Sequence, residues 1–178
     1  MLRSIPYLFA LLVLTLASCK KEAGEDFITE SDIIGSWAVA SFDNDYRVSG
    51  TYSGREVNES GSSAISDSDL QFEFDPNGSW RSSGTYTVTV TTADDRQIGQ
   101  HDGMGSGNWS FRQDTLFLTG LITYNETGFF REQQPLALTA FQKERSLDFV
   151  TRLDATETDA ELNINLRTRS DYKIALQR

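Results

Sequence analysis

Very few residues of this chain are of types that could do chemistry. Cys19 is the only cysteine and His101 the only histidine among 178 residues. Zinc sites draw on several cysteine and histidine side chains at characteristic spacings, and no such set is present. No serine lies in the Gly-x-Ser-x-Gly motif that typically presents a catalytic hydroxyl. We therefore expect no catalytic residue, no metal site and no cofactor, and we do not expect the chain to be an enzyme.

Two short acidic segments could bind calcium, and the single histidine could lie at a functional site. Residues 43–45 (DND) and 66–69 (SDSD) carry carboxylates of the kind that calcium binds. Neither segment continues as an EF-hand loop, so calcium binding is not predicted. His101 lies between polar and glycine residues, which favours a solvated surface position in a loop.

The surroundings of Cys19 suggest a different chemistry for its thiol. An apolar run of twelve residues, 5–16, follows the single charge of Arg3, and it is too short to span a bilayer as a helix. The residues 16–19 (LASC) resemble the lipoprotein box of bacteria. That resemblance implies that Cys19 is acylated, with palmitate among the acyl groups, and that residues 1–18 are a signal peptide that is cleaved.

The resemblance also implies a location. Two or more acyl chains anchor a protein stably, whereas one binds only marginally. Residues 19–30 comprise the acylated cysteine and a polar tether without apolar periodicity. We expect a protein of the cell envelope that is lipid-anchored to the outer membrane, with the bilayer as its partner through Cys19. Which face of that membrane carries the domain stays open.

The charge of the chain excludes one class of partner. The formal net charge is −10 at pH 7. Nucleic-acid affinity depends on lysine and arginine side chains that neutralise phosphates, so we expect no nucleic-acid partner. The remaining length, 31–178, fits one domain.

Alternating apolar and polar residues run through most of that domain. Clear examples are 70–74 (LQFEF), 79–92, 107–111 (GNWSF), 147–153 (LDFVTRL) and 172–178. Period-two alternation broken by short polar turns is typical of antiparallel strands. We predict an all-β fold, an up-and-down antiparallel meander of about eight to ten strands that closes into a barrel, because closure removes exposed sheet edges. Two polar segments, 44–69 and 93–106, are predicted as long loops, either a mobile lid or variation without function, and part of 46–57 is a candidate for a short strand.

A family resemblance points to the same fold. Residues 33–37 (IIGSW), with Gly35 and Trp37, resemble the Gly-x-Trp motif of lipocalins, and the hairpin 72–80 and the segment 106–118 resemble lipocalin-like lipoproteins of the Bacteroidetes type. The resemblance implies a structural role: Trp37 closes one end of the barrel, and a late cation packs on its ring. The candidates for that cation are Arg167, Arg169, Lys173 and Arg178.

A lipocalin-like barrel implies one of two interiors. An eight-stranded barrel is either filled by its own side chains or holds one small ligand. The expected inward residues are Phe72, Phe74, Tyr86, Val88, Trp109, Phe111, Leu138, Phe149, Leu162, Ile164 and Ile174, and the candidates to line a pocket are Phe72, Phe74, Tyr86, Trp109 and Phe149. We expect a lipoprotein that binds a small apolar or amphipathic ligand. The alternative is a structural or interaction lipoprotein with a filled barrel whose loops contact an envelope protein partner.

Overall fold

The computed structural model describes residues 27–122 and 133–178, and almost all of them lie in β-strands. One short helix, α2 (Glu30–Ile33), precedes the sheet. The strands are β1 (Gly35–Tyr52), β2 (Arg55–Ser66), β3 (Gln71–Phe74), β4 (Ser79–Ser83), β5 (Thr85–Thr92), β6 (Arg96–Asp102), β7 (Ser106–Arg112), β8 (Thr115–Leu118), β9 (Gln134–Gln142), β10 (Ser146–Asp159) and β11 (Ile164–Gln177). Every pairing between named strands is antiparallel. The predicted all-β antiparallel fold is confirmed.

A ring of eight strands closes because β1 has a partner on each of its edges. The first residues of β1, Gly35 to Ala38, pair with β3, and the opposite edge pairs with β11 from Ala38 to Thr51. Followed from strand to strand, the ring runs β1, β3, β4, β7, β8, β9, β10 and β11. The predicted closed barrel is therefore confirmed.

The other three strands extend the barrel wall beyond this ring. The second half of β1, from Asp43 to Tyr52, pairs with β2, which pairs with β5, which pairs with β6. The pairs β2/β3, β4/β5 and β6/β7 behave as bent strands, so spatial order follows chain order as in a meander. The bend between β4 and β5 falls at Gly84, whose φ is +98°, and a Cβ there would lie 2.5 Å from the backbone oxygen of Asp69. Only glycine fits this bend.

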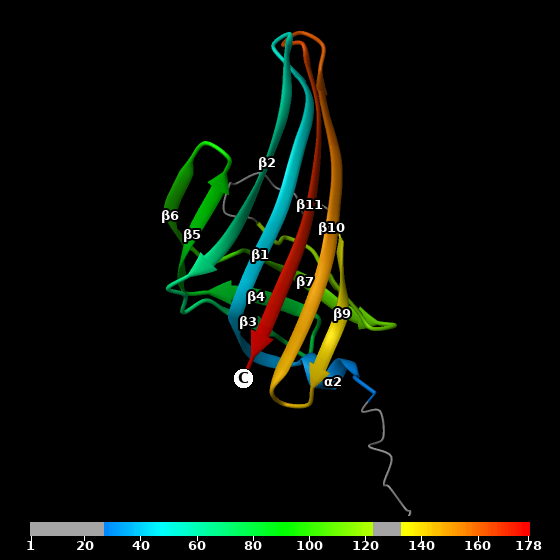
Figure 1. Cartoon of the computed structure of the whole chain (residues 1–178). Helices are drawn as coiled ribbons and strands as arrows, with labels where there is room; N and C mark the ends of the chain where they lie inside the picture. The colour runs from blue at the N-terminus through cyan, green and yellow to red at the C-terminus, as the bar shows by residue number, and fades with distance from the viewer. Residues whose placement is uncertain (1–26, 123–132) are drawn as a thin grey trace, which may run out of the picture.

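The barrel thus has two parts that differ in completeness. The open half consists of β2, β5 and β6 together with residues 43–52, 151–159 and 164–172. We call the rest of the eight-stranded ring the closed half. Among the described residues, β6 pairs only with β5, and β10 beyond Val150 pairs only with β11. The hairpins β1–β2 and β10–β11 rise together above the ring, while β5 and β6 lie to one side of them (Figure 1). The wall of the open half is therefore interrupted among these residues.

The hydrophobic core fills the closed half. Aromatic rings pack edge to face or tilted within it: Phe72 lies 5.3 Å from Trp80 and Phe74 lies 5.6 Å from Trp109 between ring centres. The indole N–H of Trp80 donates to the carbonyl oxygen of Thr119 at 2.8 Å, so the polar atom of this buried ring is satisfied. Such packing is that of a filled barrel interior.

The two predicted long loops are wrong. Residues 44–69 form the second half of β1 and all of β2, and residues 93–106 hold β6 and the start of β7. Among the expected inward residues, Leu162 lies in the tip of the β10–β11 hairpin and is 59% exposed. The loop prediction failed because many inward positions of these strands carry small or polar residues, so apolar alternation is short and weak.

Candidate functional site

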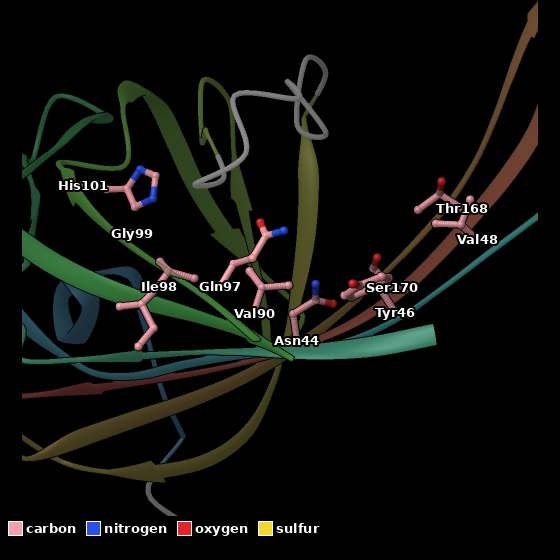
Figure 2. A pocket seen from close by; sticks show the side chains of 11 residues that line it. Asn44, Tyr46, Val48, Val90, Gln97, Ile98, Gly99, His101, Thr168 and Ser170 are labelled. Carbon is pink, nitrogen blue, oxygen red and sulfur yellow. The ribbon is translucent and has the colours of Figure 1, made fainter. Parts of the chain in front are cut away.

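A cavity of about 460 Å³ lies on the inner side of the open half. Its lining comes from four strands: β1 and β11 on one side, and β5 and β6 on the other. Figure 2 shows the two groups of side chains, with Asn44 lying between them. The volume falls within the range of pockets that enclose a small organic molecule.

The lining is mixed in polarity and carries no acidic or basic side chain other than a histidine. The apolar members are Val48, Val88, Val90 and Ile98, and the polar members are Asn44, Tyr46, Gln97, His101, Thr168 and Ser170, with Gly99 between them. Ile98 is 65% exposed, which places it at the rim of the cavity. Such a lining suits a molecule that is apolar along most of its length and polar at one end.

Asn44 lies where the core ends and the cavity begins. On the inner face of β1 it follows Phe42, which is buried and packs edge to face on Tyr172 at 5.7 Å. Asn44 is paired in register with Tyr172 on the neighbouring strand β11 and with Ser63 on the neighbouring strand β2. Its side chain is 5% exposed, and its Oδ1 is shielded from solvent and accepts no hydrogen bond. Nearly all buried polar atoms in proteins are paired, so this atom calls for an explanation.

Glycines in the open half leave room on the inner face. Tyr46 faces Gly61 directly across the β1–β2 ladder, and a Cβ at Gly61 would lie 2.6 Å from the Tyr46 hydroxyl. The aromatic ring therefore covers the glycine, an arrangement that offsets the missing side chain in a sheet. At Gly99, the three atoms nearest to an added Cβ would all belong to the His101 imidazole, the closest at 3.0 Å. The absence of a side chain at position 99 thus leaves the imidazole room to lie against the wall of the cavity.

His101 is not a loop residue. It lies on β6 opposite Tyr86, and the two rings stack at 5.6 Å with an angle of 27° between their planes. It lines the cavity and is partly buried. The expectation of a solvated histidine in a loop is therefore wrong, and the stacking fixes the imidazole against the wall.

The five residues proposed to line a pocket lie elsewhere. Phe72, Phe74, Trp109 and Phe149 are buried in the closed half, and Tyr86 is buried below the cavity on β5. None of the five lines the cavity of the open half. The residues that do line it were missed except Val88, because most fall in the segments predicted as loops. The alternation of Tyr46 and Val48 with Arg47 was the available signal.

The motif residues close the opposite end of the barrel. Trp37 is fully buried, and its indole N–H donates to the carbonyl oxygen of Ile33 at 2.7 Å. The guanidinium of Arg178 lies 4.0 Å from the Trp37 ring centre and also donates to the carbonyl oxygen of Ile34. A Cβ at Gly35 would lie 3.0 Å from Arg178 Nη2, so the close approach of the cation depends on the glycine. Of the four candidate cations, Arg178 is the one that packs on Trp37.

A second hollow, of about 610 Å³, has a different character. It is lined by Thr115, Pro135, Ala137, Val150, Thr151, Arg152, Asp171, Tyr172 and Lys173. Arg152 and Asp171 form an ion pair of 2.6 Å with both side chains exposed. Exposed charges at its border indicate a solvated surface groove and not a ligand pocket.

The remaining sequence predictions concern residues or properties outside this site. Cys19 and the predicted signal peptide lie outside the described residues. In the two described ranges, no group of three or more His, Cys, Asp and Glu side chains could hold a metal ion. No helix between residues 27 and 122 or between 133 and 178 has the length and apolar character needed to cross a membrane. Comparison with protein-family models and with curated protein sequences gives no match for this chain.

Proposed function

We propose that this chain binds a small amphipathic molecule in the cavity of the open half and acts by binding, without catalysis. The observation that carries the proposal is the cavity of about 460 Å³ between β1/β11 and β5/β6, which has an uncharged lining above a filled core. Because most of the core lies in the closed half and shares Val88 with the cavity lining, a ligand can enter and leave the open half without disrupting the core. The lipocalin-like likeness of Gly35 and Trp37 agrees with such a role.

The proposal includes an anchor in the envelope. The residues 16–19 (LASC) and the following polar tether support acylation of Cys19. The bound molecule would then be held close to a bilayer, from which an amphipathic ligand can be supplied. Metabolic labelling with an alkyne analogue of palmitate tests this part: the wild-type chain should be labelled, and Cys19→Ser should not. Equal labelling of both chains would contradict acylation at this residue.

Native mass spectrometry of the full chain purified from its own host tests ligand binding directly. We expect a reproducible extra mass that leaves on organic extraction and returns when the extract is added back. A bare polypeptide mass both before and after incubation with a host lipid extract would contradict the proposal. The extracted molecule would also show whether its polar end is neutral or charged.

One observation favours a second function, the binding of a protein partner. The two long hairpins project beyond the closed half (Figure 1), and their tips present Tyr52, which is 53% exposed, and Leu162, which is 59% exposed. Loops that a rigid scaffold presents commonly carry binding residues. The double variant Tyr52→Ser/Leu162→Ser should then lose a co-purifying envelope protein, and unchanged co-purification would exclude these tips as the contact.

A further inference from the structure

The unpaired oxygen of Asn44 gives information about the ligand that the cavity takes. Leaving a buried acceptor without a partner costs about 1–3 kcal/mol. The unpaired Oδ1 of Asn44 lies where the cavity lining meets the core, next to Phe42 and Tyr172. A buried oxygen that has no partner within the protein is available to a bound molecule.

The amide of Asn44 can present this oxygen to the cavity. The terminal torsion of an asparagine side chain is broad, so the carboxamide can turn about its Cβ–Cγ bond. Asn44 is itself a lining residue, and the turned oxygen would face the open space between β1 and β5. A carbonyl oxygen accepts hydrogen bonds but cannot donate one. Its complement is therefore a donor on the ligand.

The charge of the lining restricts that donor further. No aspartate, glutamate, lysine or arginine lines the cavity. A buried carboxylate or ammonium without a counter-charge is strongly disfavoured, and a carboxylate would in addition bring a second acceptor against Asn44. A hydroxyl donates a hydrogen bond without carrying charge. The valines at 48, 88 and 90 then contact the apolar remainder of the molecule.

We infer that the cavity selects a neutral amphipath with a hydroxyl or other uncharged donor at its inner end, and that Asn44 accepts the hydrogen bond from that donor. Asn44 is the specificity-determining residue of the site, and its amide distinguishes an alcohol from an ether or a carboxylate of the same chain length. This inference rests on the proposed function, because it assumes that the cavity is occupied by a ligand.

Calorimetric titration of the full chain with three matched probes tests it. Octanol donates and accepts a hydrogen bond, its methyl ether only accepts, and octanoate is charged at pH 7. We expect octanol to bind about tenfold tighter than the ether, the factor that corresponds to one buried hydrogen bond. Octanoate should bind at least tenfold more weakly than octanol, since its charge has no partner.

Two variants assign the preference to a residue. Asn44→Leu keeps the size of the side chain but removes the acceptor, and we expect the octanol-to-ether ratio to fall to about one while the ether still binds. Asn165→Leu makes the same substitution at an exposed position of β11 outside the cavity lining and should leave the ratio unchanged. The ratio measured on the wild-type chain alone is informative even if a variant fails to fold.

The outcomes separate the two proposals. If none of the three probes binds, the proposed function fails, and this inference fails with it. If octanol and the ether bind equally to the wild-type chain, or if Asn44→Leu keeps the preference for octanol, ligand binding stands and the role of Asn44 is overturned. If octanoate binds tightest, the inference of a neutral ligand is wrong.

Discussion

The guanidinium of Arg178 lies 4.0 Å from the ring centre of Trp37, so the end of β11 packs against the start of β1 beneath the barrel. The same guanidinium donates to the carbonyl oxygen of Ile34, at the residue that joins α2 to β1. One side chain thus connects the first strand, the last strand and the helix that covers the end of the ring. The contact closes the barrel at the end opposite the cavity.

Removing this cation should destabilise the barrel without changing the cavity. A cation–π contact contributes about 0.5–2 kcal/mol, so Arg178→Ala should lower the free energy of unfolding by roughly 1–2 kcal/mol in urea denaturation, while binding to the open half is retained. Lys173→Ala is the matched control, because Lys173 lies on β11, the strand that Arg178 directly follows, and is not stacked on an aromatic ring among the described residues. Equal losses for both variants would contradict the assignment.

Filling the cavity should weaken binding. Gly99 faces Val88 and lines the cavity, and the three atoms nearest to an added Cβ there would belong to the His101 imidazole. We expect Gly99→Leu to weaken octanol binding at least tenfold, measured by calorimetry, with the strand content unchanged by circular dichroism. Gln100→Leu places the same side chain on the exposed opposite face of β6, and it should bind octanol as the wild-type chain does.

Removing the unpaired oxygen of Asn44 should stabilise the fold. Asn44→Leu removes a buried acceptor without a partner, so the free energy of unfolding should rise by about 1–3 kcal/mol. Asn44→Ala also removes the acceptor, but it leaves unfilled space and should gain less. Denaturant titration of both variants without ligand checks this order. A destabilised Asn44→Leu would show that the amide is paired in the folded protein.

Acid should remove one set of surface ion pairs on the outer face of β10 and β11. Asp154 accepts hydrogen bonds from Arg167 at 2.6 and 2.7 Å and from Arg169 at 3.2 Å. The hydrogen bonds from Arg167, followed by its charge and by Arg169, lower the pKa of Asp154 from 3.8 to about 2.

The pH dependence follows from the direction of that shift. The folded protein binds the proton less readily than the unfolded chain, so these ion pairs stabilise the fold fully above pH 3.8 and lose their effect as the pH falls through about 2. Asp154→Asn should therefore melt at a slightly lower temperature than the wild-type chain at pH 6, and the difference should shrink as the pH falls towards 2 and disappear below it. The effect is small because the pair is exposed. A difference that stays undiminished below pH 2 would exclude ionisation as its cause.

The sequence predicted the closed half well because that half is a packed core. Phe72 and Phe74 on β3 alternate with polar residues, as do Trp109 and Phe111 on β7, and all four are buried. Alternation reports burial on one face of a strand. Where the inner face is filled by large apolar side chains, the pattern and the structure agree.

The same signal fails in the open half because its inner face borders a cavity. Asn44, Gly61, Ser63 and Gly99 occupy inward positions there, and small or polar residues leave the space that a ligand needs. A search for apolar alternation therefore assigns these strands to loops. The departure from the pattern coincides with the candidate site, as expected where local rules are relaxed for function.

The sequence alone could not show which of the four candidate cations packs on Trp37, because this depends on how β11 pairs with β1. Arg167 and Arg169 pair with Asp154 on the outer face of the sheet, far along β11 from the start of β1. Arg178 follows the last residue of β11, and only the pairing of β11 with β1 places it beneath the ring. No spacing in the sequence encodes this contact.

The separation of the core from the cavity has an evolutionary consequence. Most side chains around the cavity are not part of the packed core, whereas the contacts of Trp37, Phe74 and Trp109 maintain the fold. Selection can therefore act on the shape and polarity of the cavity in one part of the molecule while stability is inherited through the other. Descendants of this chain can diversify around the cavity and still share one packed core.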